Sequence, residues 1–304
     1  MLPVLITFFN RPNTLRRVLE SVSARQDLEV YFASDGPRNL EDRLNLDRCW
    51  ELVDHYFPGT PNTRKLNRAA NSGCRLAMTD NITWFFDLVD YGAILEDDCV
   101  PNSNFFKMQS YFLENSDYAK RFISISGSRV VIPGRESAHL KSTPSIFPMV
   151  WGWGTWANSW AKYELEITDA EEISEKISRK LFPSQRQWLK RRLFEDTFNS
   201  RFHEVNIGYI NTWDYSLTAT AWRENLPSIH LSSNSIINIG FNSQGTHTIS
   251  TAPRWVPKMF ESTEPNWSRV GDWDPSLDVE IARHVFNTGV IDFSKNRIKK
   301  LLLK

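Results

Sequence analysis

The segment Gly92-Ala-Ile-Leu-Glu-Asp-Asp-Cys-Val-Pro101 decides the fold that this sequence predicts. Its short apolar run, Ala93 to Leu95, lies between a glycine and a later proline, which is typical of a buried strand. Glu96, Asp97 and Asp98 follow the run directly. Three carboxylates cannot all lie unpaired in an apolar core, because burying an unpaired charge is strongly unfavourable. They therefore need water, basic partners or a divalent cation.

The position of these acids after the strand favours a binding site. Ligands of open α/β sheets bind at the carboxyl ends of the strands. Carboxylate oxygens are ligands that suit Mg²⁺ or Mn²⁺. The segment therefore predicts a strand that delivers acids to a cation site. A solvated acidic turn is the alternative, and the segment by itself leaves both open.

The first hundred residues predict a β-α-β-α-(β)-α-β order. Apolar strands are expected at 3–9 and 29–34, each followed by a helical pattern, and a turn at 71–73 precedes an apolar segment at 74–88. This order indicates a mostly parallel sheet with helices on both faces. The strand ends carry Asn10-Arg11, Asp35-Gly36 and the three acids, and they should meet at one sheet edge, as a nucleotide site requires. Neither GxGxxG nor GxxxxGK[ST] occurs, which disfavours a Rossmann dinucleotide site and a P-loop.

Length and composition limit the classes of protein. With 304 residues, one large domain or a domain with an extension is expected, and 36 basic against 36 acidic residues give no reason to expect nucleic acid as the main partner. Three cysteines without CxxC spacing favour a reducing compartment. No leader or run of 18 apolar residues is visible, so a cytoplasmic location is expected. The basic and apolar tail at 295–304 predicts either peripheral membrane contact or a frayed final helix.

Three later features admit two interpretations each. The alternating glycines and indoles at 151–156 predict either a loop that presents rings to a sugar or a strand with aromatics in the core. Asp214 lies where a helix is expected to begin, so it is either a functional acid or a carboxylate that the helix dipole favours. His247 lies in a polar loop and is either a ligand or a structural histidine.

Several motifs together resemble the GT-A glycosyltransferases, namely bacterial family 2-like sugar transferases and, more distantly, the Golgi N-acetylglucosaminyltransferase I. The resemblance spans residues 3–248. Its motifs, in chain order, are Asn10-Arg11-Pro12, Ser34-Asp35-Gly36, Leu95-Glu96-Asp97-Asp98, Trp151-Gly-Trp-Gly-Thr-Trp156, Trp213-Asp214-Tyr215 and Asn238-Ile-Gly-Phe241 with Thr246-His247. It implies a GT-A fold with a mostly parallel central sheet and a helical, aromatic extension on the acceptor side.

The resemblance also implies a role for each matching residue. On the donor side, the residues that bind the nucleotide-sugar would be Thr7, Phe8, Arg11, Asp35, Glu96 and Asp97. The family's DXD motif implies Asp98 as the ligand of Mn²⁺ or Mg²⁺, with His247 as a further ligand. Asp214 matches a catalytic acid in a Trp-Asp motif. On the acceptor side, the residues would be Trp151, Gly152, Trp153 and Trp213.

The implied function is a metal-dependent inverting glycosyltransferase. It would move a hexosyl or N-acetylhexosaminyl group from a nucleoside-diphosphate-sugar, with UDP favoured, to a hydroxyl of a glycan or lipid-linked glycan in surface polysaccharide synthesis. The expected segments are a nucleotide-sugar-binding half at 1–126, an acceptor-binding and catalytic half at 127–250, and an extension at 251–304. Two alternatives are a sugar-1-phosphate nucleotidyltransferase, although residues 10–13 lack the glycine of its phosphate loop, and a degenerate GT-A carbohydrate-binding module.

Overall fold

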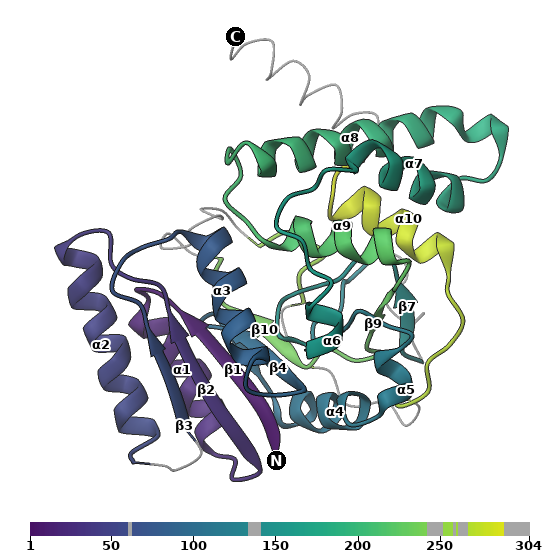
Figure 1. The fold of residues 1–304 in the computed structure, drawn as a ribbon. Coiled ribbons are helices and arrows are strands. Elements are labelled where there is room, and N and C mark those ends of the chain that lie inside the picture. Colours follow the sequence, from purple (N-terminus) through teal and green to yellow (C-terminus); the bar gives the residue numbers. More distant parts are fainter. Residues whose placement is uncertain (60–62, 133–140, 242–251, 258–259, 261–266, 289–304) are drawn as a thin grey trace.

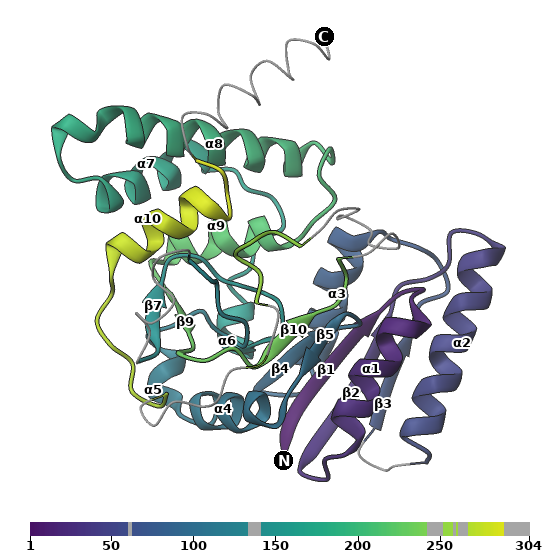
Figure 2. The same ribbon diagram turned by 180° about the vertical axis from the view of Figure 1, so that it is seen from behind.

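The computed structural model describes residues 1–59, 63–132, 141–241, 252–257, 260 and 267–288. In these residues one eight-stranded sheet runs through the molecule in the order β3-β2-β1-β4-β8-β6-β9-β7, and helices cover both of its faces (Figures 1 and 2). Its strands are β3 (Thr63–Asn67), β2 (Leu28–Ser34), β1 (Leu2–Phe8), β4 (Tyr91–Glu96), β8 (Trp153–Trp156), β6 (Ser124–Ser126), β9 (Ser228–His230) and β7 (Thr143–Ser145). A separate pair consists of β5 (Cys99–Pro101) and β10 (Ile236–Asn238).

The first half of the sheet is parallel, as the sequence predicts. Strands β3, β2, β1 and β4 are parallel neighbours, and β1 is buried along its whole length. Alternate side chains enter different cores, since Val4 and Ile6 lie in one apolar cluster and Leu5 in the other. A strand that is buried on both faces has to be apolar throughout, which is why this half could be predicted from its apolar runs.

The helices divide between the two faces. The helices are α1 (Pro12–Ser23), α2 (Leu40–Tyr56), α3 (Cys74–Phe86), α4 (Ser103–Leu113), α5 (Ser116–Ala119), α6 (Ala157–Trp160), α7 (Ala170–Leu181), the 3₁₀ turn η1 (Gln185–Gln187), α8 (Trp188–Asn206), α9 (Asp214–Glu224) and α10 (Pro275–His284). One apolar cluster buries side chains of α1, α2 and α4, and the other buries those of α3 and of α6 to α10. No helix in the described ranges is both long enough and apolar enough to cross a membrane.

The second half of the sheet is mixed and is continuous with the first. Strand β8 runs antiparallel to both of its neighbours, β4 and β6, so the sheet crosses the boundary expected at residue 126. Helix α10 belongs to the same body, because the buried Asp278 accepts hydrogen bonds from Ser145 Oγ at 2.6 Å and Ile146 N at 3.1 Å. Residues from all three expected segments therefore pack together.

Residues 231–235 separate two short strands that belong to different sheets, because β9 ends at His230 and β10 begins at Ile236. Polar groups of the intervening turn bond to the segment that follows β6: Asn234 Oδ1 accepts from Arg129 N at 3.1 Å, and Ser235 N donates to Gly127 O at 3.1 Å. The segment at 151–156 contributes strand β8, so the second of its two interpretations, a strand with aromatics in the core, is the one observed.

Candidate functional site

A cavity of about 330 Å³ lies where the carboxyl ends of β1, β2 and β4 meet. This is the sheet edge at which ligands bind in open α/β folds. The residues predicted from the sequence that line it are Thr7, Phe8, Arg11, Asp35, Glu96, Asp97, Asp98 and Trp151. Asn10, Asn238, Gly240 and Phe241, which belong to the quoted motifs but were given no role, also line it. The lining residues outside those motifs are Phe9, Arg38, Asn71, Gly73, Cys74, Ala77, Met78, Asn81 and Asn211.

Arg11 is the basic partner of the acids that follow β4. Its Nε donates to Asp97 Oδ2 at 3.2 Å, its Nη2 donates to Asp97 Oδ1, and its Nη1 donates to Asp98 Oδ2 at 2.8 Å. A guanidinium that binds one carboxylate through two nitrogens fixes the orientation of that carboxylate and stabilises its negative charge. Arg11 lies just after β1, and the parallel pairing of β1 with β4 brings it beside acids that are 86 and 87 residues away.

One arginine does not balance three carboxylates. Burial, and then the charges of Asp98 and Asp97, raise the pKa of Glu96 to about 8. Burial also raises the pKa of Asp97 to about 6, against the opposing effect of Arg11. The cluster therefore holds more acid than its protein partners neutralise, and a cationic ligand would be favoured beside it.

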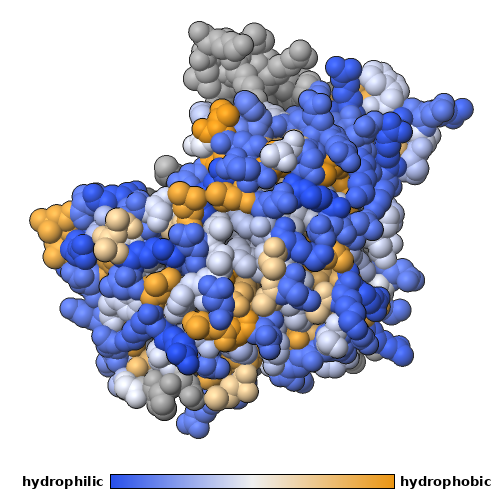
Figure 3. All heavy atoms as spheres, in the orientation of Figure 1, coloured by the Kyte–Doolittle hydropathy of each residue, from blue (hydrophilic) through white to orange (hydrophobic). Residues whose placement is uncertain are grey.

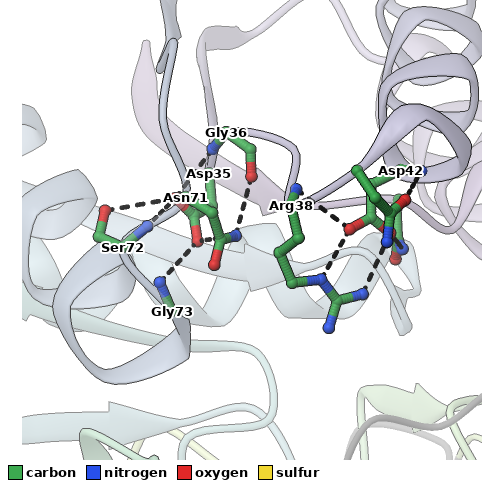
Figure 4. A network of polar contacts seen from close by, with 9 residues as sticks. Asp35, Gly36, Arg38, Asp42, Asn71, Ser72 and Gly73 are labelled. Atoms are coloured by element: carbon green, nitrogen blue, oxygen red, sulfur yellow. Dashed lines mark hydrogen bonds and ion pairs between the residues drawn. The ribbon is translucent and has the colours of Figure 1, made fainter.

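Asp35 is held in a different way (Figure 4). Its Oδ1 accepts from Gly36 N at 2.8 Å, Ser72 N at 2.9 Å and Ser72 Oγ at 3.3 Å. Its Oδ2 accepts from Asn71 Nδ2 at 2.7 Å and Gly73 N at 3.0 Å. These five donors use the acceptor capacity of the carboxylate. Asp35 lines the cavity, but its side chain is engaged in fixing the segment at 71–73, which leads into α3.

A second polar network lies beside the first (Figure 4). Buried Asp42 accepts from Arg38 Nε at 2.6 Å and from Asn10 Nδ2 at 2.6 Å. The same ion pair places the Arg38 guanidinium carbon 5.0 Å from the centre of the Phe9 ring. Arg38 and Phe9 thus offer a planar cation and an aromatic ring at the cavity. Neither residue was predicted from the sequence, although Phe9 ends the first apolar run and Arg38 follows Asp35 by three positions.

Strand β10 brings a late segment of the chain to the acids. Its antiparallel pairing with β5 sets Asn238 opposite Cys99, and Ile239 N donates to Asp98 O at 2.8 Å. A side chain at Gly240 would place its Cβ 2.2 Å from Asp98 Oδ2, so the backbone there approaches the carboxylate as only glycine can. The motif at 238–241 therefore lines the cavity because of this strand pairing.

Asp214 lies next to the cavity rather than in its wall. It is the first residue of α9, and its Oδ1 accepts from Thr212 Oγ1 at 2.6 Å and from Tyr215 N at 2.9 Å. Burial and then the charges of Glu96 and Asp214 raise the pKa of Cys74 to about 12. The charge of Asp214 also contributes to the raised pKa of Glu96. Because Cys74 and Glu96 both line the cavity, Asp214 is on the same side of the molecule as the acid cluster.

Of the indoles expected on the acceptor side, Trp151 alone lines the cavity. It stacks on Trp255 at a ring distance of 5.2 Å. Trp153 and Trp213 are 1% and 2% exposed and stack on each other in the core at 5.4 Å, so they present no ring to a ligand. Gly152 has a φ of +58°, and a Cβ there would lie 2.4 Å from Ile236 Cδ1. The structure thus gives Trp153, Trp213 and Gly152 a packing role, and the acceptor-side role that the resemblance implies for them stays a prediction.

The described residues offer no complete metal cage. No group of three or more His, Cys, Asp or Glu in the described ranges is placed to hold an ion. His247, the predicted second ligand, lies outside the described residues, as does the tail at 295–304. Asp98 Oδ1 keeps acceptor capacity, since its described partner is the weak donor Cys99 Sγ at 3.5 Å. Mg²⁺ is commonly bound through one or two carboxylates together with substrate phosphates, and Asp98 fits that mode.

Comparisons with known proteins place few constraints on this chain. No family model matches it, and no curated protein sequence matches it. Among solved structures, a mannosyltransferase from Pyrobaculum calidifontis, in complex with GDP-Man and Mn²⁺, is similar at 11% identity and a TM-score of 0.39. The alignment covers 73% of this chain and 69% of that chain. A similarity of this size does not establish a shared fold.

Proposed function

We propose that this protein is a glycosyltransferase that uses a nucleotide-sugar donor. The observation that carries the proposal is the cavity at the ends of β1, β2 and β4, where Arg11 partly neutralises three acids. Asp214 is close enough to this cluster for its charge to raise the pKa of Glu96. Its volume, about 330 Å³, is in the range of small-molecule sites. The resemblance of its motifs to GT-A transferases supports the same conclusion.

The donor is proposed to lie across the strand ends. Phe9 and Arg38 present flat surfaces that suit a nucleobase, and Thr7 and Phe8 line the same wall. In this arrangement Glu96 and Asp97 would contact the ribose and sugar hydroxyls, which are good donors to carboxylates. UDP is the favoured nucleotide, on the strength of the family resemblance.

Breaking the sugar–phosphate bond leaves negative charge on the diphosphate. Mn²⁺ or Mg²⁺ held by Asp98 and by the diphosphate itself would supply compensating positive charge. Arg11 holds Asp98 through Oδ2, and Oδ1 is the oxygen that keeps capacity for the ion. Because Gly240 packs against the same carboxylate, Asp98 cannot turn away from the cavity without moving that backbone.

Asp214 is proposed as the general base. Bonds from Thr212 Oγ1 and Tyr215 N orient its carboxylate, which lies in the first turn of α9, where the helix dipole interacts favourably with negative charge. It would take the proton of the acceptor hydroxyl as the new bond forms, so that the sugar is transferred in one displacement with inversion. The acceptor is proposed to be a glycan or lipid-linked glycan, with transfer of a hexosyl or N-acetylhexosaminyl group, on the cytoplasmic side of surface polysaccharide synthesis.

The decisive experiment measures the product released from a panel of nucleotide-sugars. Release of nucleoside diphosphate supports sugar transfer, whereas release of pyrophosphate would support a nucleotidyltransferase. Asp214→Asn should lower the transfer rate about 10²- to 10⁴-fold, because the base is lost, while nucleotide binding persists. Asp117→Asn, which alters an exposed acid in the first turn of α5, is the matched control and should retain the rate. If Asp214→Asn kept most of its activity, the base would have to be another group.

A further inference from the structure

The connection between α7 and α8 concentrates positive charge in a chain whose formal net charge is zero. Residues 176–194 contain no aspartate or glutamate. Their basic residues are Lys176, Arg179, Lys180, Arg186, Lys190, Arg191 and Arg192. The segment covers the end of α7, the turn η1 and the first two turns of α8.

Two large apolar side chains are exposed within this basic segment. Trp188 is 60% exposed and Leu189 is 45% exposed, and they are adjacent at the start of α8. Next to them, Leu193 and Phe194 turn into the core, so the helix has a separate inner face that anchors it. Trp188 and Leu189 are therefore not needed to hold α8 in place.

Part of the charge is not used within the protein. Lys176 donates to the carbonyls of Trp222 and Arg223, and Arg179 pairs with Glu175. In contrast, the side chains of Arg186, Lys190 and Arg191 make no ion pair with any of the residues that the structure describes. Three basic groups without a described ion pair thus lie close in sequence to the two exposed apolar side chains. Trp188 and Arg191 also line a shallow pocket with the acids Glu175, Glu195 and Asp196, so Arg186 and Lys190 are the basic groups away from those acids.

The turn that carries these side chains is fixed. Ser184 Oγ accepts from Arg186 N at 3.3 Å, and Gln187 Oε1 accepts from Ser184 N at 3.1 Å, which forms a capping box. A surface that is ordered before binding loses less entropy when it meets its partner.

We propose that the basic corner, defined as residues 183–192, docks on an anionic membrane surface. Tryptophan is favoured at the boundary between headgroups and acyl chains, and leucine adds apolar area there. Each nearby lysine or arginine is attracted by the surface potential of anionic lipids. A second copy of this corner is disfavoured as a partner because the two basic surfaces would repel. Nucleic acid would use the charge but would leave the adjacent leucine without an apolar contact.

The position of the corner is compatible with an accessible cavity. The hairpin of α7 and α8 projects from the body on the side away from β1, β2 and β3 (Figures 1 and 2), and the corresponding part of Figure 3 is largely hydrophilic. The other end of α8 leads through Asn211, a cavity residue, into α9. Residues 192 and 206 of α8 are 14 positions apart, so the helix separates the corner from that end by about 21 Å. Docking therefore leaves the cavity open, and the inference does not depend on the proposed function.

Vesicle co-sedimentation of the full-length protein tests this proposal. We expect binding to equimolar phosphatidylglycerol and phosphatidylcholine vesicles at low salt, weak binding to phosphatidylcholine alone, and release at high salt because the charges are screened. The triple variant Arg186→Gln, Lys190→Gln, Arg191→Gln should bind at least about tenfold more weakly. Trp188→Ala with Leu189→Ser should also weaken binding and leave the thermal unfolding midpoint unchanged, because both side chains are exposed.

Two matched variants separate this corner from other surfaces. Lys295→Gln, Lys299→Gln, Lys300→Gln removes the same number of charges from the tail, and Ile207→Ser with Tyr209→Ser removes two exposed apolar groups at the far end of α8. Both should retain vesicle binding. The proposal is overturned if the tail variant alone loses binding, if neutral vesicles bind equally well, or if the corner variants abolish only self-association or RNA binding.

Discussion

Asp35 and the acids at 96–98 follow strand ends of one sheet and line the same cavity. They differ in their described partners: Asp35 has hydrogen-bond donors alone, whereas the three acids share one arginine. Asp35 has five hydrogen-bond donors, three of them backbone N–H groups, and no ion pair in the described part of the chain. The triplet has one arginine for three carboxylates, and the pKa of Glu96 is raised to about 8 by burial and by its neighbours.

The difference separates two uses of an acid at a strand end. A carboxylate whose lone pairs are all used by local donors shapes the wall of a site, as Asp35 does for the segment at 71–73. A cluster with more acid than base keeps negative charge for something that binds, such as a cation with its phosphate ligand. By this criterion we expect Asp35 to act as a positioning residue and Asp98 as a binding residue.

The largest effect that this contrast predicts is on transfer by Asp98→Asn. The amide keeps the shape and can still accept from Arg11, but it loses the charge that would hold a cation. We expect the rate to fall about 10²- to 10³-fold, a loss of several kcal/mol in transition-state stabilisation. The free energy of unfolding in urea should stay the same or rise, because one of three crowded like charges is gone. A variant that unfolds readily would show that Asp98 is structural.

Asp35→Ala should give the opposite result. It leaves the backbone N–H groups of Gly36, Ser72 and Gly73 without their acceptor. A buried donor without a partner, here the N–H of Gly36, costs about 1–3 kcal/mol, and the two partly exposed donors cost less. We expect the free energy of unfolding to fall by about 3 kcal/mol, measured by urea denaturation. Asp54→Ala, at an exposed acid that pairs with Lys65, is the control and should change it by less than about 1 kcal/mol. Normal stability for Asp35→Ala would remove the distinction between the two acids.

The strands and the strand-end residues that depend on local sequence patterns could be predicted from the sequence. Strands β1, β2 and β4 are apolar runs because both of their faces are covered, and each ends in polar residues at the cavity. Strand β3, the partly exposed edge strand, has the residues Thr63–Asn67 and shows no apolar run, so its position was only implied by the β-α-β order.

The distinction between the acids could not be predicted, because it depends on partners far away in sequence. The donors to Asp35 that follow Gly36 come from 36 to 38 residues later, in a segment that looked like a simple turn. Arg11 reaches Asp97 across 86 residues. The indoles at 151–156 were ambiguous for a similar reason. Trp153 lies in the middle of the sheet because it pairs with Ile94 and Ser126, which are distant in sequence, and the glycines beside it mask the alternation of polar and apolar residues that marks a strand.

Nucleotide and metal should bind together rather than independently. Because Asp98 is a single described ligand, Mn²⁺ alone should hardly change the thermal unfolding midpoint, and UDP alone should change it little. Together they should stabilise the protein by about 2.7 kcal/mol when the ligand is at 100 times its dissociation constant. Asp98→Asn should lose this joint effect and Asp117→Asn should keep it. Strong stabilisation by Mn²⁺ alone would indicate a protein-only cage that includes residues outside the described ranges.

The smallest predicted effect concerns Asn71, which links Asp35 to the turn that it shapes. Asn71 Nδ2 donates to Asp35 Oδ2 at 2.7 Å and to Gly36 O at 2.8 Å. Asn71→Ala removes both bonds but leaves four donors on Asp35, so the free energy of unfolding should fall by only about 1 kcal/mol. Nucleotide affinity should weaken by a larger factor than stability alone explains, because the segment at 71–73 would lose its fixed position in the cavity wall. Asn115→Ala, which removes an exposed helix cap at α5, is the control for the stability loss and should leave affinity unchanged. If both variants left affinity unchanged, the order that Asp35 imposes on this turn would not matter for binding.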